Sequence, residues 1–373
     1  MTSDSLVPAP IAHLPWRLIF LVCLIGGFGA IVQYSAAGGS LYPWALPHTV
    51  RFGAFLGLAI LLSYVKPQHF RDAAFSAYAV VVFLLILVEV LGFVGGGAQR
   101  WLNLGFINLQ PSELMKPVIV LTVARFYDML PVGEIRRWSA IWPAGILIGI
   151  PASLILVQPD LGTASMVVFG GLTVMFLAGL PLRLFVGGAA AVAVAVPVAY
   201  SFLHEYQQKR VTIFLNPEAD PLGAGYHISQ SKIAIGSGGL FGKGFMNGTQ
   251  SHLDYLPEGH TDFVFATMAE EWGLMGGIFL IACFFLVLKW GLGVAIDTRN
   301  RFERLTAAGL TTTIFFYVAI NLMMVMGLAP VVGIPLPLFS YGGSAMLTVM
   351  LCLGILMAID RNNRRDPYGG FDT

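Results

Sequence analysis

Long apolar stretches alternate with short polar connections along almost the whole chain. A helix that crosses a membrane needs about 20 mostly apolar residues. Stretches of this kind predict ten transmembrane helices, near residues 16–35, 47–65, 70–92, 112–130, 138–156, 163–180, 182–203, 264–291, 304–326 and 339–359. One long polar interruption, residues 204–263, predicts a loop between the seventh and eighth helices. We therefore predict an all-α polytopic membrane protein, organised as a single membrane domain over residues 1–373.

Positive charges predict the orientation of these helices, because short cytoplasmic loops carry an excess of Lys and Arg. With the N-terminus inside, the predicted cytoplasmic segments contain Arg17, Lys66, Arg71, Arg125, Arg136, Arg137, Arg183, Lys289, Arg299, Arg301, Arg304, Arg361, Arg364 and Arg365. The short outer loops contain little positive charge beyond Arg100. Both termini are therefore predicted to be cytoplasmic, and the long loop is predicted to face outward.

The first apolar stretch has one alternative interpretation. Ser35-Ala36-Ala37 resembles the small-residue cleavage site of a signal peptide. However, the residues before the stretch are nearly uncharged, and the charge pattern is consistent only if the stretch remains as a helix.

Composition agrees with a membrane protein and excludes other classes. The 373 residues are 57% hydrophobic and 11% charged, whereas a soluble domain carries about 25% charged residues. The net charge of +1 offers no basic field for a nucleic acid. Cys23, Cys283 and Cys352 lie far apart within apolar stretches, so they predict neither a disulfide framework nor a zinc site.

The segment His260–Gly273 joins the long loop to the eighth helix. It places Asp262 at the boundary, with Glu270 and Glu271 two to three helical turns deeper. An acid at the edge of an apolar span is costly unless it is paired, protonated or used in function. Asp262 is therefore our candidate catalytic base, while the sequence assigns no role to the other two acids. Thr261 and Asp262 equally suit a helix N-cap, and the two roles can coexist.

The fourth helix is predicted to start at Gln110-Pro-Ser-Glu113, which puts Pro and Ser in a first turn. Glu113 and Lys116 are three residues apart and share a helix face. One interpretation is a structural ion pair at the membrane edge. The other is a cationic site in which Lys116 and Arg100 bind a phosphate group. Arg100 and Trp101 also suit an anchor at the membrane interface.

Asp160 lies in the short fifth connection, Val157–Thr163. One interpretation is that it caps the next helix. The other is that it binds a divalent cation together with Asp262, because hard cations prefer oxygen ligands and diphosphate substrates usually bring such an ion. Mg²⁺ or Mn²⁺ is therefore a candidate cofactor. Glu89, a lone acid inside the third helix, has no partner that the sequence identifies.

The long loop contains a glycine-rich stretch, residues 236–244, that resembles a phosphate-binding loop. It fails the Walker pattern, because Ser237 replaces the first Gly and Gly244 replaces the Ser or Thr after the lysine. We interpret it as a flexible loop with an exposed backbone, in which Lys232 and Lys243 are weak candidates for phosphate contacts. The polar run that follows, residues 247–260, suits sugar contacts.

The last outer connection, from Gly327 to Gly343, contains three prolines and no charge. It holds too many helix breakers to be a helix. We expect it to re-enter the membrane and line a cavity, because irregular backbone at that depth must be buried in protein or face water.

Four motifs occur in a fixed order along the chain. They are Gln-Pro-Ser-Glu at 110–113, Gln-Pro-Asp-Leu-Gly-Thr at 158–163, Leu-Pro-Glu-Gly-His-Thr-Asp-Phe-Val-Phe-Ala at 256–266, and Phe-Ser-Tyr-Gly-Gly-Ser at 339–344. Together they resemble the SEDS family (shape, elongation, division and sporulation) over nearly the whole chain. Gly248-Thr-Gln-Ser251 and the short tails look like its elongation branch, RodA, rather than its division branch, FtsW. Gly259 departs from the family, which usually has a bulkier residue there, so we expect a more flexible backbone before His260.

The resemblance implies a glycosyltransferase of the bacterial inner membrane that polymerises lipid II into β-1,4 glycan strands of peptidoglycan during cell elongation and rod-shape maintenance. It implies lipid II and the growing lipid-linked glycan as ligands, and a class B penicillin-binding protein as partner. The matching position makes Asp262 the catalytic carboxylate. The candidate substrate-binding residues are Arg100, Trp101, Glu113, Lys116, Asp160, Lys232, Lys243, Gln250, His260 and Ser340.

This chemistry needs only one acid–base residue. The acceptor is a sugar 4-hydroxyl, which is a poor nucleophile until a base removes its proton. The donor leaves as a lipid diphosphate, a good leaving group once cations offset its charge. A single displacement would invert the α-linked donor to a β-linked product. Two alternatives are a lipid II transporter, which would tolerate Asp262→Asn better than an enzyme would, and a non-catalytic scaffold of the elongation machinery.

Overall fold

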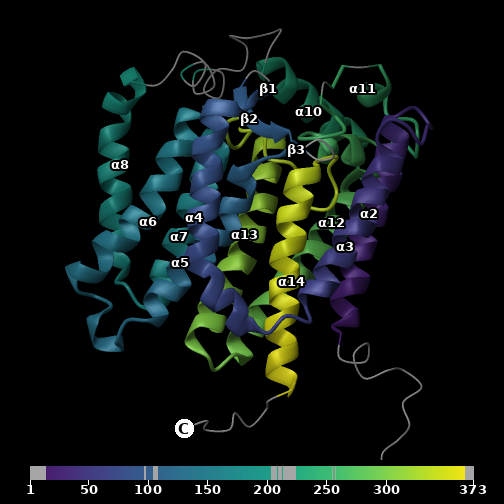
Figure 1. Cartoon of the computed structure of the whole chain (residues 1–373). Coiled ribbons are helices and arrows are strands. Elements are labelled where there is room, and N and C mark those ends of the chain that lie inside the picture. Colours follow the sequence, from purple (N-terminus) through teal and green to yellow (C-terminus); the bar gives the residue numbers. More distant parts are fainter. Residues whose placement is uncertain are drawn as a thin grey trace, which may run out of the picture.

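The computed structural model describes residues 14–95, 98–103, 108–202, 208, 212, 224–253, 255, 256 and 258–365. Ten long helices run through this part of the chain as a bundle (Figure 1). They are α2 (Trp16–Ala36), α3 (Ala45–Leu62), α4 (Pro67–Leu91), α5 (Pro111–Asp128), α6 (Trp138–Val157), α7 (Leu161–Ala178), α8 (Leu182–Phe202), α12 (Val264–Asp297), α13 (Arg301–Val325) and α14 (Gly343–Arg365). Each coincides with one predicted helix, so the predicted fold class is confirmed.

Eight of these described helices are long and apolar enough to cross a membrane. The other two are α5, which carries four charged residues, and α8, which contributes a shorter apolar segment, Leu182–Ala195. Most of α5 is buried among its neighbours, so its charges are compensated inside the protein rather than exposed to lipid. The chain is a multi-pass membrane protein.

Small elements cover one end of the bundle. The connection after α4 forms three short antiparallel strands in the order β1 (Phe93–Gly95), β2 (Ala98–Asn103) and β3 (Asn108–Leu109). The predicted long loop contains the helices α10 (Ala224–Gly238) and α11 (Thr249–His252). The 3₁₀ turn η1 (Val132–Glu134), which precedes α6, lies at the other end of the bundle. In Figure 1, α2 begins and α14 ends at that same end of the bundle. The strands β1–β3 and the helices α10 and α11 were not predicted from the sequence.

The glycine-rich stretch packs against a break in α12. This helix is interrupted at Gly273, where φ is 65° and ψ is −161°, a conformation that only glycine adopts readily. Four backbone hydrogen bonds join the two segments: Lys243 N to Glu270 O (2.9 Å), Gly244 N to Glu271 O (3.1 Å), Leu274 N to Gly239 O (2.9 Å) and Met275 N to Leu240 O (3.1 Å). They satisfy peptide groups that the break would otherwise leave unpaired.

This packing contradicts the interpretation of residues 236–244 as a flexible loop with an exposed backbone. A Cβ atom at Gly238 or Gly242 would lie 2.0 Å from a carbonyl oxygen of α12. The glycines are therefore needed for close backbone contact with α12. Backbone groups of this stretch form hydrogen bonds with α12 at its break, so these groups are not available to bind phosphate.

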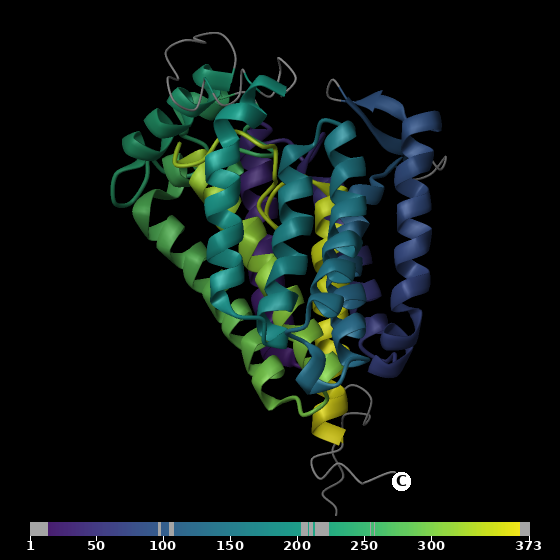
Figure 2. The ribbon, with the colours of Figure 1, turned by 90° about the vertical axis from the view of Figure 1, so that its left-hand side faces the viewer.

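The apolar connection between α13 and α14 enters the helix bundle. Ile334, Leu336 and Phe339 are buried, and the Phe339 carbonyl lies so close to α2 that a Cβ atom at Gly29 would be 2.8 Å from its oxygen. Figure 2 shows this yellow segment descending between the helices. The connection is therefore buried inside the bundle, while its predicted re-entry into the membrane stays a prediction. The predicted lining of a cavity stays a prediction.

Candidate functional site

Asp262 lies in a tight turn that precedes α12. The Glu258 carbonyl oxygen accepts hydrogen bonds from the backbone N–H groups of Thr261 (3.1 Å) and Phe263 (3.2 Å). The N-cap residue of α12 is Phe263, whose side chain makes no capping hydrogen bond. The structure therefore does not support the N-cap alternative for Asp262, whose half-buried carboxylate remains a candidate for chemistry.

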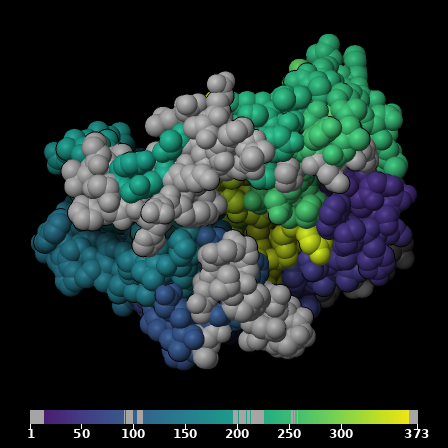
Figure 3. Space-filling model, turned by 90° about the horizontal axis from the view of Figure 1, so that it is seen from above, coloured from purple at the N-terminus to yellow at the C-terminus, as the bar shows by residue number. Residues whose placement is uncertain are grey.

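Backbone from the α13–α14 connection approaches this carboxylate. Gly333 has a φ of +69°, and a Cβ atom at this position would lie 3.4 Å from Asp262 Oδ2. The carbonyl oxygen of Asp262 accepts a hydrogen bond from the Asn321 side chain on α13 (2.9 Å). Two segments remote in sequence thus surround the candidate base. Seen from above, yellow residues of the C-terminal part lie recessed between green, purple and blue segments (Figure 3).

Aromatic side chains cluster next to Asp262. The His260 ring stacks on Trp44, with centroids 4.1 Å apart and planes 9° apart, and lies 6.2 Å from the Tyr341 ring. The Arg51 guanidinium lies 4.9 Å from the centroid of the Tyr341 ring, in cation–π geometry. Burial lowers the pKa of the His260 imidazole, and the charge of Glu258 offsets part of that shift. A neutral ring at pH 7 suits contact with a sugar.

The sequence did not predict that Trp44, Arg51 and Tyr341 lie near the candidate site at Asp262. The available signal was a Trp and an Arg near the outer end of the second predicted helix, together with a Tyr in the last motif. Ser340, a predicted substrate-binding residue, is buried beside them. Its hydroxyl accepts a hydrogen bond from the Leu336 backbone N–H (2.8 Å).

Glu113 and Lys116 form a buried pair with a third member. Lys116 Nζ lies 2.6 Å from Glu113 Oε1 and donates to the Tyr317 hydroxyl at 2.8 Å. Tyr317 in turn donates a short hydrogen bond to the other oxygen of Glu113. All three side chains are buried between α5 and α13. This geometry favours the structural ion pair over the phosphate-binding interpretation.

Arg100 has partners separate from those of Lys116. It donates to the carbonyl oxygens of Gln158 (3.1 Å) and the following proline (2.5 Å), and one of its nitrogens lies 3.9 Å from Asp160. Asp160 accepts a hydrogen bond from Thr163 N (3.0 Å) and so caps α7, as one interpretation predicted. Arg100, on β2 beside the half-buried Trp101, therefore fastens the small sheet to the α6–α7 turn.

Glu270 organises the glycine-rich stretch and the run that follows it. Its fully buried carboxylate lies 2.6 Å from Lys243 Nζ and accepts hydrogen bonds from the backbone N–H groups of Thr249 (2.9 Å) and Gln250 (3.1 Å). Glu271 accepts a hydrogen bond from the Ser35 hydroxyl (2.5 Å) and so ties α12 to α2. The amine of Lys243 is thus paired inside the protein, whereas Gln250 is held through its backbone N–H, and its side-chain oxygen Oε1 has no hydrogen-bond partner among the residues that the structure describes.

The exposed Lys232 lies on α10, and its amine approaches Gly327, just after the end of α13. A Cβ atom at Gly327 would be 2.7 Å from its amine nitrogen. Glu89, near the end of α4, is exposed.

The described residues do not form a metal-binding cluster. Across the described ranges, no three His, Cys, Asp or Glu side chains are close enough to hold a metal ion. The Asp160 carboxylate already binds Thr163 N and Gln110 Nε2 (3.4 Å). Binding of a divalent cation by the pair of Asp160 and Asp262 stays a prediction.

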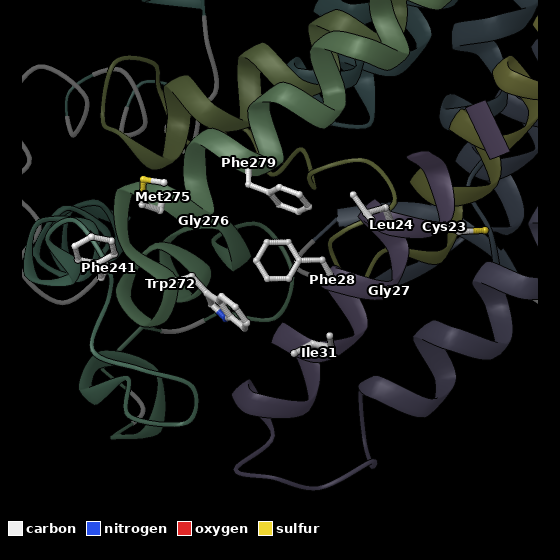
Figure 4. A pocket seen from close by; sticks show the side chains of 10 residues that line it. All are labelled: Cys23, Leu24, Gly27, Phe28, Ile31, Phe241, Trp272, Met275, Gly276 and Phe279. Atoms are coloured by element: carbon white, nitrogen blue, oxygen red, sulfur yellow. The ribbon is translucent and has the colours of Figure 1, made fainter. Parts of the chain in front are cut away.

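An apolar groove of about 640 Å³ lies between α2 and α12. Phe28, Trp272 and Phe279 line it, as Figure 4 shows, and no charged side chain is among its lining residues. The groove offers no carboxylate, imidazole or amine for acid–base chemistry, so the candidate site remains the turn at Asp262.

Comparison with known proteins places the chain in a family. The model of the FtsW/RodA/SpoVE cell cycle proteins matches residues 15–365. The peptidoglycan glycosyltransferase MrdB of Escherichia coli (strain K12) is 43% identical over 354 residues, which cover 94% of each chain.

Two solved structures share the fold. A chain from a peptidoglycan synthase complex that coordinates polymerization and crosslinking has a TM-score of 0.82 and 34% identity, covering 95% of this chain and 99% of that one. The rod shape determining protein RodA of Thermus thermophilus has a TM-score of 0.71 and 31% identity, covering 95% and 98%. This chain therefore belongs to the FtsW/RodA/SpoVE family, the SEDS family that its four motifs resemble.

Proposed function

We propose that this protein is a peptidoglycan glycosyltransferase of the elongation (RodA) branch, which polymerises lipid II with Asp262 as general base. Support for the activity comes from relatives named for it that match nearly the whole chain. One observation carries the assignment of the base. The half-buried Asp262 side chain lies in a braced turn beside an aromatic and cationic cluster.

The chemistry follows from this arrangement. Asp262 removes the proton of the acceptor 4-hydroxyl, which then attacks the anomeric carbon of the donor. The bond to the diphosphate breaks, and the lipid diphosphate leaves with the electron pair. A single displacement inverts the α-linked donor to a β-1,4 product. Arg51, held over the Tyr341 ring, supplies positive charge at the same cluster.

The substrate, partner and location belong to the same proposal. Lipid II and the growing lipid-linked glycan bind at the end of the bundle that carries β1–β3, α10 and α11. A class B penicillin-binding protein is the partner that cross-links the glycan, in keeping with the structural relative from a synthase complex. The protein resides in the bacterial inner membrane with both termini cytoplasmic. A divalent cation, Mg²⁺ or Mn²⁺, enters only as an ion brought by the substrate diphosphate.

The test uses the purified full chain with its penicillin-binding partner and labelled lipid II, and products are separated by size on a gel. Wild type should give a ladder, and Asp262→Asn should lower the rate by about 10²-fold or more. Asp72→Asn is the matched control, because its side chain is 66% exposed and removes the same charge elsewhere. It should polymerise like wild type.

Each outcome has a distinct meaning. A ladder from wild type and from Asp262→Asn at equal rate would refute Asp262 as the base but leave the polymerase standing. No ladder from wild type with the partner present would refute the polymerase, and lipid II flipping in proteoliposomes would then be measured to test the transporter. Loss of Asp262→Asn from the membrane would show that the residue is mainly structural.

A further inference from the structure

Two buried amide side chains hold the turn that carries Asp262. Gln33 lies near the C-terminal end of α2, and Asn321 lies near the C-terminal end of α13. Both have 0% of their surface exposed. Neither residue belongs to any of the four motifs, and neither has a charge. Burying a polar side chain costs free energy unless it is hydrogen-bonded. In both residues the amide nitrogen is hydrogen-bonded, whereas the side-chain oxygens Gln33 Oε1 and Asn321 Oδ1 have no partner in the described part of the chain.

Each amide uses its two hydrogens in the same way. Asn321 Nδ2 donates to the carbonyl oxygens of Asp262 (2.9 Å) and Ile334 (2.7 Å). Gln33 Nε2 donates to the carbonyl oxygens of His260 (2.8 Å) and Phe339 (3.4 Å). All four acceptors are carbonyl oxygens, so only the NH₂ side of each amide can face them. One hydrogen goes to the Asp262 turn and the other to the α13–α14 connection.

These bonds hold the backbone that carries the Asp262 carboxylate. Asn321 orients the peptide group of Asp262 itself and joins it to Ile334, the neighbour of Gly333. The backbone of Gly333 in turn lies against Asp262 Oδ2. Two residues earlier, the His260 carbonyl accepts from Gln33 and also from the Tyr341 backbone N–H (2.9 Å). The turn is thus fixed on both sides of the candidate base.

We propose that Asn321 and Gln33 are positioning residues for glycosyl transfer. They set the orientation of Asp262 relative to the α13–α14 connection without touching the substrate themselves. The inference rests on the proposed function, and it deepens it by naming what holds the base in place. A general base works only within hydrogen-bond reach of its proton, and a misplacement of about 1 Å can lower a rate by about 10²-fold.

The test removes the donors while keeping the shape of each side chain. Asn321→Leu and Gln33→Met are nearly isosteric and lack the NH₂ group. In the lipid II assay with the partner, each should lower kcat by about 10- to 100-fold, the range set by loss of alignment. KM for lipid II should change less than about threefold, because binding contacts are kept.

The matched control is Thr122→Val. Thr122 is fully buried, and its hydroxyl donates to the carbonyl oxygens of Ala74 (3.3 Å) and Val118 (2.8 Å), away from the turn. The Thr122→Val variant loses these buried hydrogen bonds but leaves the contacts of the Asp262 turn unchanged. It should keep wild-type kcat and KM, even if its thermal unfolding temperature falls as much as that of the amide variants.

The outcomes separate this inference from the proposed function. The positioning role would be overturned if both amide variants kept the wild-type kcat. It would also be overturned if Thr122→Val lowered kcat as much as the amide variants do. Failure of both variants to give folded protein by gel filtration would overturn it too, since their role would then be structural. Asp262→Asn is run beside them. An inactive Asp262→Asn with unaffected amide variants would refute only the positioning role, whereas a fully active Asp262→Asn would refute the base.

Discussion

The buried trio of Glu113, Lys116 and Tyr317 allows a sharp test of structural against substrate-binding roles. If it is a structural ion pair, removing one charge leaves the other buried and uncompensated. We therefore compare Lys116→Met, Glu113→Gln and the double variant. The double variant removes both charges and keeps the side-chain volumes close to those of wild type.

The magnitude follows from the geometry. Two unit charges 2.6 Å apart attract by about 6 kcal/mol at an effective dielectric constant of about 20, and much of this offsets the cost of taking both ions out of water. Breaking a buried pair by removing one partner costs about 3–5 kcal/mol, whereas replacing both partners is often close to neutral. Lys116→Met should therefore be strongly destabilised, and the double variant should recover most of the loss.

The assay is thermal unfolding of detergent-purified protein, read beside lipid II polymerisation per folded molecule. We expect a clear fall in unfolding temperature for Lys116→Met, recovery in the double variant, and polymerisation by the double variant within about tenfold of wild type. A Lys116→Met protein that is as stable as wild type but inactive would refute the structural role. It would restore the interpretation of Lys116 as a substrate contact.

Two further predictions concern the packing of the glycine-rich stretch against α12 and the divalent cation. Gly242→Ala should sharply lower the yield of folded protein, because its φ is +80° and a Cβ atom would lie 2.0 Å from the Glu271 carbonyl oxygen. Gly236→Ala, which meets no atom within 4 Å, is the control and should fold normally; equal yields would contradict the packing argument. Excess EDTA should lower polymerisation, and added Mg²⁺ should restore it. Unchanged turnover in the chelator would remove the divalent cation from the reaction.

The candidate site could be predicted only in part. Asp262 and His260 were found because an acid and a polar run at the edge of an apolar span are unusual, whatever the fold. Asp160 and Lys116 were also noticed, yet their alternatives stayed open because the sequence does not show which groups face them. Gln33 and Asn321 gave no signal, since an uncharged amide inside an apolar helix is ambiguous until its partners are known.

Errors in the predicted elements have a similar origin. The glycine-rich stretch was interpreted as flexible because glycine permits both loose loops and very close packing. Only the break at Gly273 shows which of these applies. The short strands and α10 were missed because their stability comes from packing on the bundle rather than from a strong local pattern.

The sequence by itself determined the number of long helices, their order and the place of Asp262 just before a long apolar helix. These follow from the length of apolar runs and the position of charges, which are local properties of the chain. The tertiary structure alone decided which polar groups meet inside the protein. Gln33 reaches a carbonyl 227 residues away, Tyr317 reaches Glu113 across 204 residues, and Asn321 reaches Asp262 across 59. Such pairs depend on how helices pack, and in a bundle of similar apolar helices no local pattern specifies that packing.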